Sequence, residues 1–243
     1  MSEPAVLFIH GFPFDHSMWR HQLEALSRRH CIAPDLRGTG MSEAPADPDE
    51  YSMAAYARDL ITLLDKQRID RVVLCGLSMG GYIAFELLRQ IPERVRAAIL
   101  CNTKSAADTP EAKRGRDALA AKARAHGARA VAAELVPKLV ARPEVVREVT
   151  AMIERQPIAG IVGALRALRE RPDSTPLLGE IRVPVLVIAG EDDQITPAAG
   201  MEEMARAIPS ARFARIQHAG HLTPLEQPAA VNAELESFLA KLG

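Results

Sequence analysis

The sequence predicts one α/β protein, in which helices cover both faces of a mostly parallel sheet of about six strands. Short apolar runs recur along the 243 residues, and most of them lack the alternation that a half-exposed strand shows. Amphipathic helical patterns lie between these runs, and strands that alternate with helices form βαβ units with parallel strands. A chain of this length can bury a sizeable core within one domain.

The expected strands are the apolar runs at residues 6–9, 31–33, 72–75, 97–100, 185–188 and 213–216. The last run alternates more than the others, so we expect it nearer an edge of the sheet. Apolar residues at helical spacing predict helices over residues 52–66, 79–90 and 228–241. Pro92 follows the second of these patterns, and a helix does not readily continue through proline.

A long segment, residues 104–180, contains helical patterns but no strand-like run. Pro143 and Pro157 each predict the start of a helix there, because proline is favoured in the first turn. The sequence therefore predicts a core formed by residues 1–103 and 181–243, with residues 104–180 inserted into it as a helical unit.

Composition argues against several classes of partner. The chain has 30 Lys and Arg residues against 31 Asp and Glu residues, a net charge of −1, so we expect neither nucleic acid nor an anionic membrane as a partner. The apolar runs are too short for a membrane span, and the first lacks the basic residues that open a signal peptide. The three cysteines lie in or beside apolar runs and are expected to be reduced thiols. These features predict a cytoplasmic protein.

A candidate nucleophile lies between an expected strand and an expected helix. The residues at 76–80 are G-L-S-M-G, with Ser78 at the centre. A serine at such a turn, the nucleophile elbow, is held in a strained conformation with its hydroxyl exposed above the sheet. The start of the following helix adds backbone N–H groups and partial positive charge beside it. The alternative is that Ser78 only caps the helix and the glycines only permit the turn.

The loop after the first strand is a candidate oxyanion hole, the pair of N–H groups that binds the charge developing on a carbonyl oxygen. Its sequence, residues 10–13, is H-G-F-P, and proline has no N–H. We therefore expect the backbone of Phe12 to supply one donor and that of Met79, the residue after Ser78, to supply the other. The side chains of Phe12, Trp19 and Met79 are the expected walls of the substrate pocket.

Histidines in the N-terminal part of the chain do not have the spacing of a metal site. No metal and no other cofactor is therefore expected. His10 is predicted to brace the oxyanion loop through hydrogen bonds.

Candidates for an acid and a base follow the last two expected strands. Glu191, Asp192 and Asp193 come after residues 185–188, and all three are candidates for the acid on chemistry alone. A histidine after the last strand, His218 or His221, could take the serine proton and return it to a leaving group.

Three longer motifs resemble those of the α/β-hydrolase family. Residues 35–42, D-L-R-G-T-G-M-S, are similar to its D-x-R-G-x-G-x-S loop. Residues 190–197 resemble its G-x-x-D-x-x-x-P pattern, and this likeness selects Asp193 as the acid. Residues 220–228 resemble its G-H-x-x-x-x-E-x-P ending, which selects His221 as the base. The order serine, acid, histidine is also that of the family.

The resemblance extends over essentially the whole chain and implies an α/β-hydrolase fold with residues 104–180 as a cap over the active site. Few residues precede the first expected strand, so the first two strands of the family are expected to be missing. That would leave residues 31–33 near an exposed edge of a six-stranded sheet.

A serine nucleophile excludes the branches of the family that use aspartate, the haloalkane dehalogenases and epoxide hydrolases. The chain most resembles small serine carboxylesterases and 3-oxoadipate enol-lactonases. We therefore expect Ser78, Asp193 and His221 to form a catalytic triad that hydrolyses a small-molecule ester or lactone through an acyl-enzyme. The alternatives are a cofactor-free perhydrolase or haloperoxidase with the same triad, and a hydrolase-like ligand receptor with little turnover. No motif predicts an oligomeric state.

Overall fold

In the computed structural model, which describes residues 3–242, six strands form one parallel sheet in the order β2-β1-β3-β4-β5-β6. The strands are β1 (Ala5–Ile9), β2 (Cys31–Ile32), β3 (Val72–Leu77), β4 (Val95–Cys101), β5 (Val185–Gly190) and β6 (Ala211–Ile216). The prediction of six mostly parallel strands is therefore confirmed.

The edges of the sheet lie where the sequence predicts them. β2 is only two residues long and pairs with β1 through Val6 beside Cys31 and Leu7 beside Ile32. β6 forms the opposite edge, and its residues are mostly half-buried or exposed. By contrast, every residue of β1, β3 and β5 is buried. Strands covered on both faces need apolar residues throughout, which explains why they appear in the sequence as continuous apolar runs.

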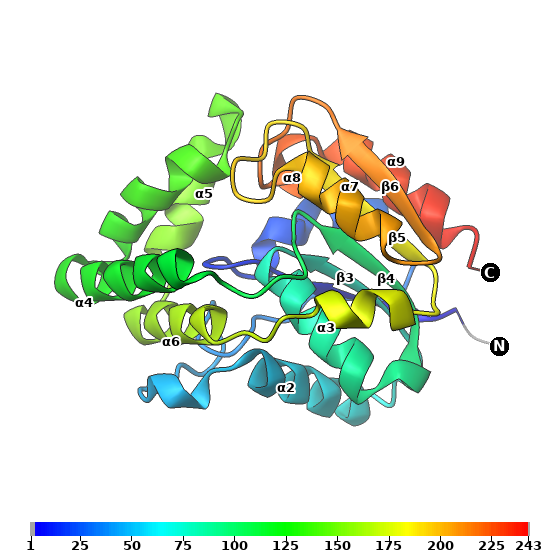
Figure 1. The fold of residues 1–243 in the computed structure, drawn as a ribbon, viewed down its shortest axis with the longest axis horizontal. Coiled ribbons are helices and arrows are strands. Elements are labelled where there is room, and N and C mark those ends of the chain that lie inside the picture. Colours follow the sequence, from blue (N-terminus) through cyan, green and yellow to red (C-terminus); the bar gives the residue numbers. More distant parts are fainter. Residues whose placement is uncertain (1–2, 243) are drawn as a thin grey trace.

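Helices cover the sheet on both sides, with α3 and α7 in front of it and α9 behind β6 (Figure 1). The helices are α1 (Arg20–Ala25), α2 (Met53–Lys66), α3 (Met79–Gln90), α4 (Pro110–Leu139), α5 (Pro143–Glu154), α6 (Ile158–Arg169), α7 (Ala198–Arg206), α8 (Thr223–Glu226) and α9 (Pro228–Leu239). The patterns at residues 52–66, 79–90 and 228–241 correspond to α2, α3 and α9. No helix in residues 3–242 is both long enough and apolar enough to cross a bilayer.

Residues 104–180 contain the helices α4, α5 and α6, which pack against one another beside one end of the sheet (Figure 1). α5 begins at Pro143, as predicted, and α6 begins one residue after Pro157. α4 is bent at Gly127, whose φ of 76° lies in the left-handed region that glycine adopts without a steric cost. The insertion between β4 and β5 therefore has the helical character that the sequence predicts.

A buried carboxylate joins this helical segment to the loop after β1. Asp15, only 2% exposed, accepts hydrogen bonds from Arg155 Nε (2.7 Å) and Nη2 (2.9 Å), from Gln156 Nε2 (2.8 Å) and from Ser17. The amide oxygen of Gln156 in turn accepts from the backbone N–H of Gly40 (2.9 Å). Burial raises the pKa of Asp15, but the bonds from Arg155, Ser17 and Gln156 outweigh burial and hold it well below its usual range.

We expect Asp15→Asn to lower the free energy of unfolding by about 2 kcal/mol, because a neutral amide replaces the buried carboxylate that accepts charge-assisted hydrogen bonds from the half-exposed guanidinium of Arg155. Urea unfolding at pH 7 measures the change. A carboxylate with a depressed pKa stabilises the fold above its unfolded pKa, here 3.8, and that contribution is lost as the pH falls further. The difference between parent and variant should therefore shrink below about pH 4.

The matched control is Glu148→Gln, which removes a charge from another ion pair between the same parts of the chain. Glu148 of α5 pairs with Arg20 of α1, but both side chains are more than a third exposed. An exposed pair contributes about 1 kcal/mol or less. Equal losses of stability in the two variants would contradict a special role for Asp15.

Candidate active site

The predicted acid and base meet at the carboxyl edge of the sheet. Asp193 follows β5 and His221 follows β6, and Asp193 Oδ2 lies 2.8 Å from His221 Nδ1. Both side chains are buried, with residue exposures of 5% and 2%. Of the other acid candidates, Glu191 and Asp192 are exposed, as is the second histidine, His218. The structure thus joins the pair that the family resemblance selects.

Close packing of two loops makes this contact possible. A Cβ added to Gly190, at the end of β5, would lie 2.1 Å from the carbonyl oxygen of Gly220, the residue before His221. Any side chain at position 190 would therefore push the acid loop away from the histidine loop.

The carboxylate of Asp193 is held on both oxygens. Oδ1 accepts from the backbone N–H groups of Ile195 (2.8 Å) and Thr196 (3.0 Å), while Oδ2 accepts from Thr196 Oγ1 (2.6 Å) and Asn102 Nδ2 (2.8 Å) as well as from His221. Burial raises the pKa of Asp193, but the bonds from His221, Asn102 and Thr196 outweigh it and lower the pKa to about 2. An ionised carboxylate fixes the proton of neutral His221 on Nδ1, which leaves Nε2 as a proton acceptor.

Ser78 occupies a strained turn between β3 and α3. Its φ of 53° and ψ of −110° place a non-glycine residue in a region that L-amino acids rarely adopt. The side chain is half-buried and makes no capping hydrogen bond to α3 within the described residues. The interpretation of Ser78 as a mere helix cap therefore has no support in the structure, whereas a strained serine between a strand and a helix is what the predicted nucleophile elbow requires.

Two adjacent residues after β4 connect the elbow to the acid. Thr103 Oγ1 donates to the carbonyl oxygen of Ser78 (2.8 Å), and the side chain of Asn102 donates to Asp193. Ser78, Asp193 and His221 thus lie around the same end of β4, each at the carboxyl end of a different strand. In α/β sheets this edge is where ligands bind.

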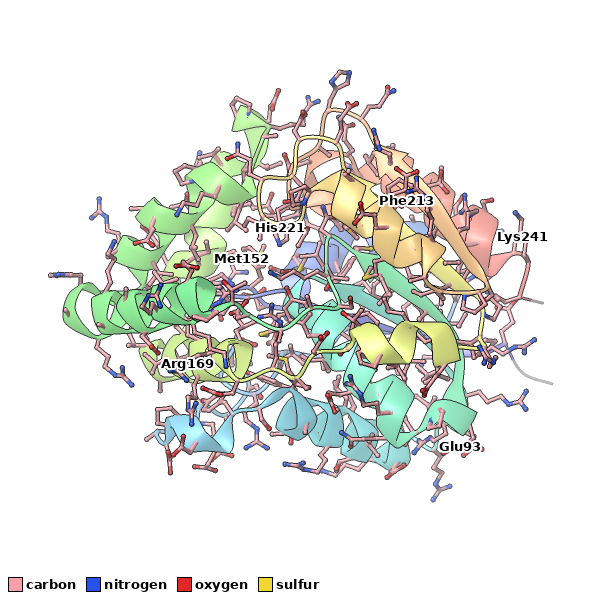
Figure 2. The ribbon with its side chains drawn as sticks, viewed as in Figure 1. Glu93, Met152, Arg169, Phe213, His221 and Lys241 are labelled. Carbon is pink, nitrogen blue, oxygen red and sulfur yellow. The ribbon has the colours of Figure 1, made fainter. Side chains whose placement is uncertain are left out.

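This edge also faces the helices of residues 104–180. The backbone N–H of His221 donates to the carbonyl oxygen of Leu139 at the end of α4 (3.0 Å). Figure 2 shows His221 at the side of the sheet next to these helices, with Met152 of α5 on the helical side. Contacts between the two parts of the chain therefore involve the predicted base itself.

Glu226, the glutamate of the motif at residues 220–228, also connects the loop that carries His221 to the helices of residues 104–180. Its Oε1 accepts from the backbone N–H groups of Gly220 and Leu222, at 3.1 Å each, which flank the predicted base. Its Oε2 accepts from the backbone N–H groups of Ala141 (2.8 Å) and Arg142 (3.1 Å), which join α4 to α5. One buried carboxylate thus holds the histidine loop and the helical segment together.

The predicted oxyanion donors lie on segments that pack directly on each other. A Cβ added to Gly80 would lie 2.0 Å from the carbonyl oxygen of Ile9, so the start of α3 touches the end of β1. The backbone N–H groups of Phe12 and Met79 have no hydrogen-bond partner within residues 3–242. Two free N–H groups on adjacent segments beside a serine are what stabilisation of an oxyanion requires.

The three side chains predicted to line the substrate pocket are all buried. Phe12 is 8% exposed, and Met79 and Trp19 are fully buried. The Trp19 ring packs against Phe8 of β1, with 5.0 Å between ring centroids. Contact of any of these side chains with a substrate stays a prediction.

His10 makes the hydrogen bonds of a structural brace. Its Nδ1 lies 2.9 Å from the carbonyl oxygen of Gly11, and its Nε2 accepts from the backbone N–H of Leu36 (3.0 Å). Complete burial lowers the pKa of His10, so its ring is neutral, with Nδ1–H as donor and Nε2 as acceptor. The side chain thereby ties the oxyanion loop to the loop at residues 35–42.

Among the described residues, one group could offer ligands to a metal ion: Asp15, His16 and Asp35, whose ligand atoms all lie within 4.8 Å of one another. The carboxylate of Asp15 already accepts from Arg155, and that of Asp35 accepts from the backbone and ring of His16. These carboxylate oxygens are therefore already surrounded by N–H groups, one of them a cationic guanidinium, and such surroundings do not suit a metal cation.

Comparisons with known proteins agree with this geometry. Residues 4–228 match the family model described as alpha/beta hydrolase fold. The chain belongs to the α/β-hydrolase family. This α/β hydrolase is similar to a malate-bound thermophilic esterase from Thermogutta terrifontis, with a TM-score of 0.93 and 39% identity over 98% of this chain and 90% of the other.

Two further similarities concern enol-lactonases. The enol-lactonase of Burkholderia xenovorans has a TM-score of 0.90 and 30% identity over 99% of this α/β hydrolase and 92% of that chain. The 3-oxoadipate enol-lactonase 2 of Acinetobacter baylyi is 29% identical over 245 residues, covering 98% of this chain and 89% of that protein. The expected resemblance to esterases and enol-lactonases is thus confirmed.

Three residues that hold the site together, Asn102, Thr103 and Thr196, are not among those predicted from the sequence. The first two directly follow β4 and begin one residue beyond the strand expected at 97–100, so their side chains belong at the same edge as Ser78 and Asp193. A search for polar residues after every expected strand would have found them. Thr196 lies within the acid motif at residues 190–197 but is not one of its fixed positions.

Proposed function

We propose that this α/β hydrolase cleaves carboxylic esters or lactones through an acyl-enzyme formed on Ser78. The observation that carries the proposal is the buried hydrogen bond between Asp193 and His221 at the edge of the sheet where the strained serine lies. The similarity of this chain to both esterases and enol-lactonases supports acyl transfer. The proposal therefore includes both esters and lactones as substrates.

The first half-reaction transfers the acyl group to the enzyme. His221 Nε2 takes the proton of the Ser78 hydroxyl as the oxygen attacks the carbonyl carbon of the substrate. The N–H groups of Phe12 and Met79 donate to the oxyanion of the tetrahedral intermediate. The intermediate collapses as the bond to the alcohol oxygen breaks and His221 returns the proton to that oxygen; in a lactone the alcohol stays attached to the acyl group.

The second half-reaction releases the acid. His221 takes a proton from water, whose oxygen attacks the acyl carbon and displaces Ser78 Oγ, which recovers the proton. Asp193 stays ionised throughout, holds the Nδ1–H tautomer and stabilises the imidazolium that forms in each step.

We further propose that residues 104–180 act as a cap that selects the substrate. The hydrogen bonds of His221 to Leu139 and of Glu226 to Ala141 and Arg142 support this, because they hold the helical segment against the histidine loop. Phe12, Trp19 and Met79 are the proposed walls of the acyl pocket on the core side.

A substrate panel combined with active-site labelling tests the proposal. Nitrophenyl esters of increasing acyl length and a set of lactones should be hydrolysed, and a fluorophosphonate probe should label Ser78. Peracid formation from acetate and peroxide that outpaces ester hydrolysis would instead identify a perhydrolase. Absence of labelling at Ser78 would favour a hydrolase-like ligand receptor with little turnover.

A further inference from the structure

Asn102, the residue that follows β4, has an unusual combination of backbone and side-chain constraints. It is fully buried, and its φ of 44° is in the left-handed region, which asparagine tolerates better than most residues. Its backbone N–H donates to the carbonyl oxygen of Ile188 on β5 (2.9 Å). The backbone therefore turns sharply here and fixes the direction of the side chain.

The Asn102 amide contacts the proposed acid and residues on either side of the proposed base. Its Nδ2 donates to Asp193 Oδ2 (2.8 Å) and to the carbonyl oxygen of Gly220 (3.2 Å), the residue before His221. Its Oδ1 accepts from Thr223 Oγ1 (2.7 Å), two residues after the histidine.

Only one orientation of this amide fits its surroundings. An amide has two N–H donors on nitrogen and an acceptor oxygen. The nitrogen side faces two acceptors, a carboxylate and a carbonyl, while the oxygen side faces a hydroxyl. Rotation by 180° would place the amide oxygen against both acceptors. The side chain is thus locked by partners on two segments, the loop after β5 and the segment after β6.

We propose that Asn102 is a positioning residue for the triad, which fixes the Asp193 carboxylate and the chain before His221 in one arrangement. This inference rests on the function proposed above. Asp193 Oδ2 accepts from Asn102, Thr196 and His221. Without the Asn102 amide, Oδ2 keeps only Thr196 and His221 as donors, so the carboxylate is held less firmly against the imidazole, and the histidine loop loses its hydrogen bonds to the residue after β4. The neutral charge of the amide also matters, because a second carboxylate here would compete for protons with Asp193.

The first test removes the side chain without straining the backbone. In Asn102→Gly we expect kcat to fall about ten- to a hundredfold, the effect of losing a hydrogen bond to a charged group. KM should change little, because Asn102 contacts the acid and not the substrate. Arg68→Gly is the matched control, since Arg68 is exposed and also has a left-handed φ, 56°. Its kinetics should equal those of the parent.

The second test keeps the shape of the side chain and changes its charge. In Asn102→Asp two carboxyl groups lie within hydrogen-bond distance, and each raises the pKa of the other. Where both are ionised, the second negative charge favours the imidazolium form of His221. The acid limb of the kcat/KM profile should then move to higher pH by roughly one unit. A residue with only a structural role would lower activity without moving this limb.

Labelling separates the inference from the proposed function. If the parent protein does not react with a fluorophosphonate at Ser78, the proposed function fails. If the parent reacts, but Asn102→Gly reacts at the same rate and Asn102→Asp has an unshifted pH profile, the positioning role alone is overturned. Should Asn102→Gly fail to fold, the pH profile of the isosteric Asn102→Asp still decides the question.

Discussion

Ser78→Ala is expected to abolish the proposed hydrolysis of esters and lactones, lowering kcat by about 10⁴-fold or more, and to leave the fold unchanged. The expected loss is large because the Ser78 oxygen is the proposed attacking atom, and no other hydroxyl follows β3 directly. Steady-state kinetics on the best substrate of the panel, with fluorophosphonate labelling, measures the effect. Thermal unfolding should give the same midpoint for both proteins, because alanine fits the same strained backbone.

A companion variant tests the strain itself. Ser78→Gly should be equally inactive but more stable than the parent by about 1 kcal/mol, because glycine adopts a φ of 53° without the steric cost that serine has. A strained backbone conformation lowers the stability of the fold, and such strain is typical of residues whose function requires that conformation. Retained turnover in either variant would contradict the nucleophile assignment, and unchanged stability in Ser78→Gly would contradict the strain.

The sheet was predictable from the sequence because its strands are buried on both faces. Such strands need apolar residues at every position, so β1, β3 and β5 stand out without any knowledge of their neighbours. The polar Arg212 and Arg215 interrupt β6 and mark it as an edge strand before the structure is known.

Several helices were not predictable in the same way. α1 and α7 have six and nine residues, too few for a periodic pattern to emerge from the local sequence. α4 is rich in alanine and packs against both α5 and α6, so its apolar residues do not form a single stripe. The bend at Gly127 divides this pattern further.

Some parts of the candidate site were also predictable from the sequence, and others were not. The serine turn and the motifs at residues 190–197 and 220–228 are each formed by consecutive residues, so the sequence alone places them at the ends of strands. Chemistry alone cannot choose between the three consecutive acidic residues, because the choice depends on which side chain turns inward; only the resemblance to the family motif selects Asp193 from the sequence. The structure buries Asp193 and leaves Glu191 and Asp192 in solvent. Asn102 lies 91 residues before its partner Asp193, so no local pattern connects them.

Asp193→Asn is expected to lower kcat by about 10⁴-fold, because it reverses the tautomer of His221. An amide places a nitrogen donor where the carboxylate had an acceptor. The backbone N–H groups of Ile195 and Thr196 require an oxygen at the Oδ1 position, so the amide nitrogen must occupy the Oδ2 position. There it donates to His221 Nδ1, the ring proton moves to Nε2, and the ring can no longer accept the proton of Ser78.

The adjacent carboxylate supplies the matched control for this prediction. Asp192→Asn makes the same chemical change one residue away at an exposed position, and its kcat should stay within about twofold of the parent. Asp193→Asn should also unfold at a lower urea concentration, because the amide nitrogen faces the side-chain amide of Asn102, itself a donor. Equal activity losses in the two variants would show that charge near the site matters but that Asp193 does not orient His221. A loss confined to Asp193→Asn is what a buried carboxylate that fixes one tautomer of its histidine must produce.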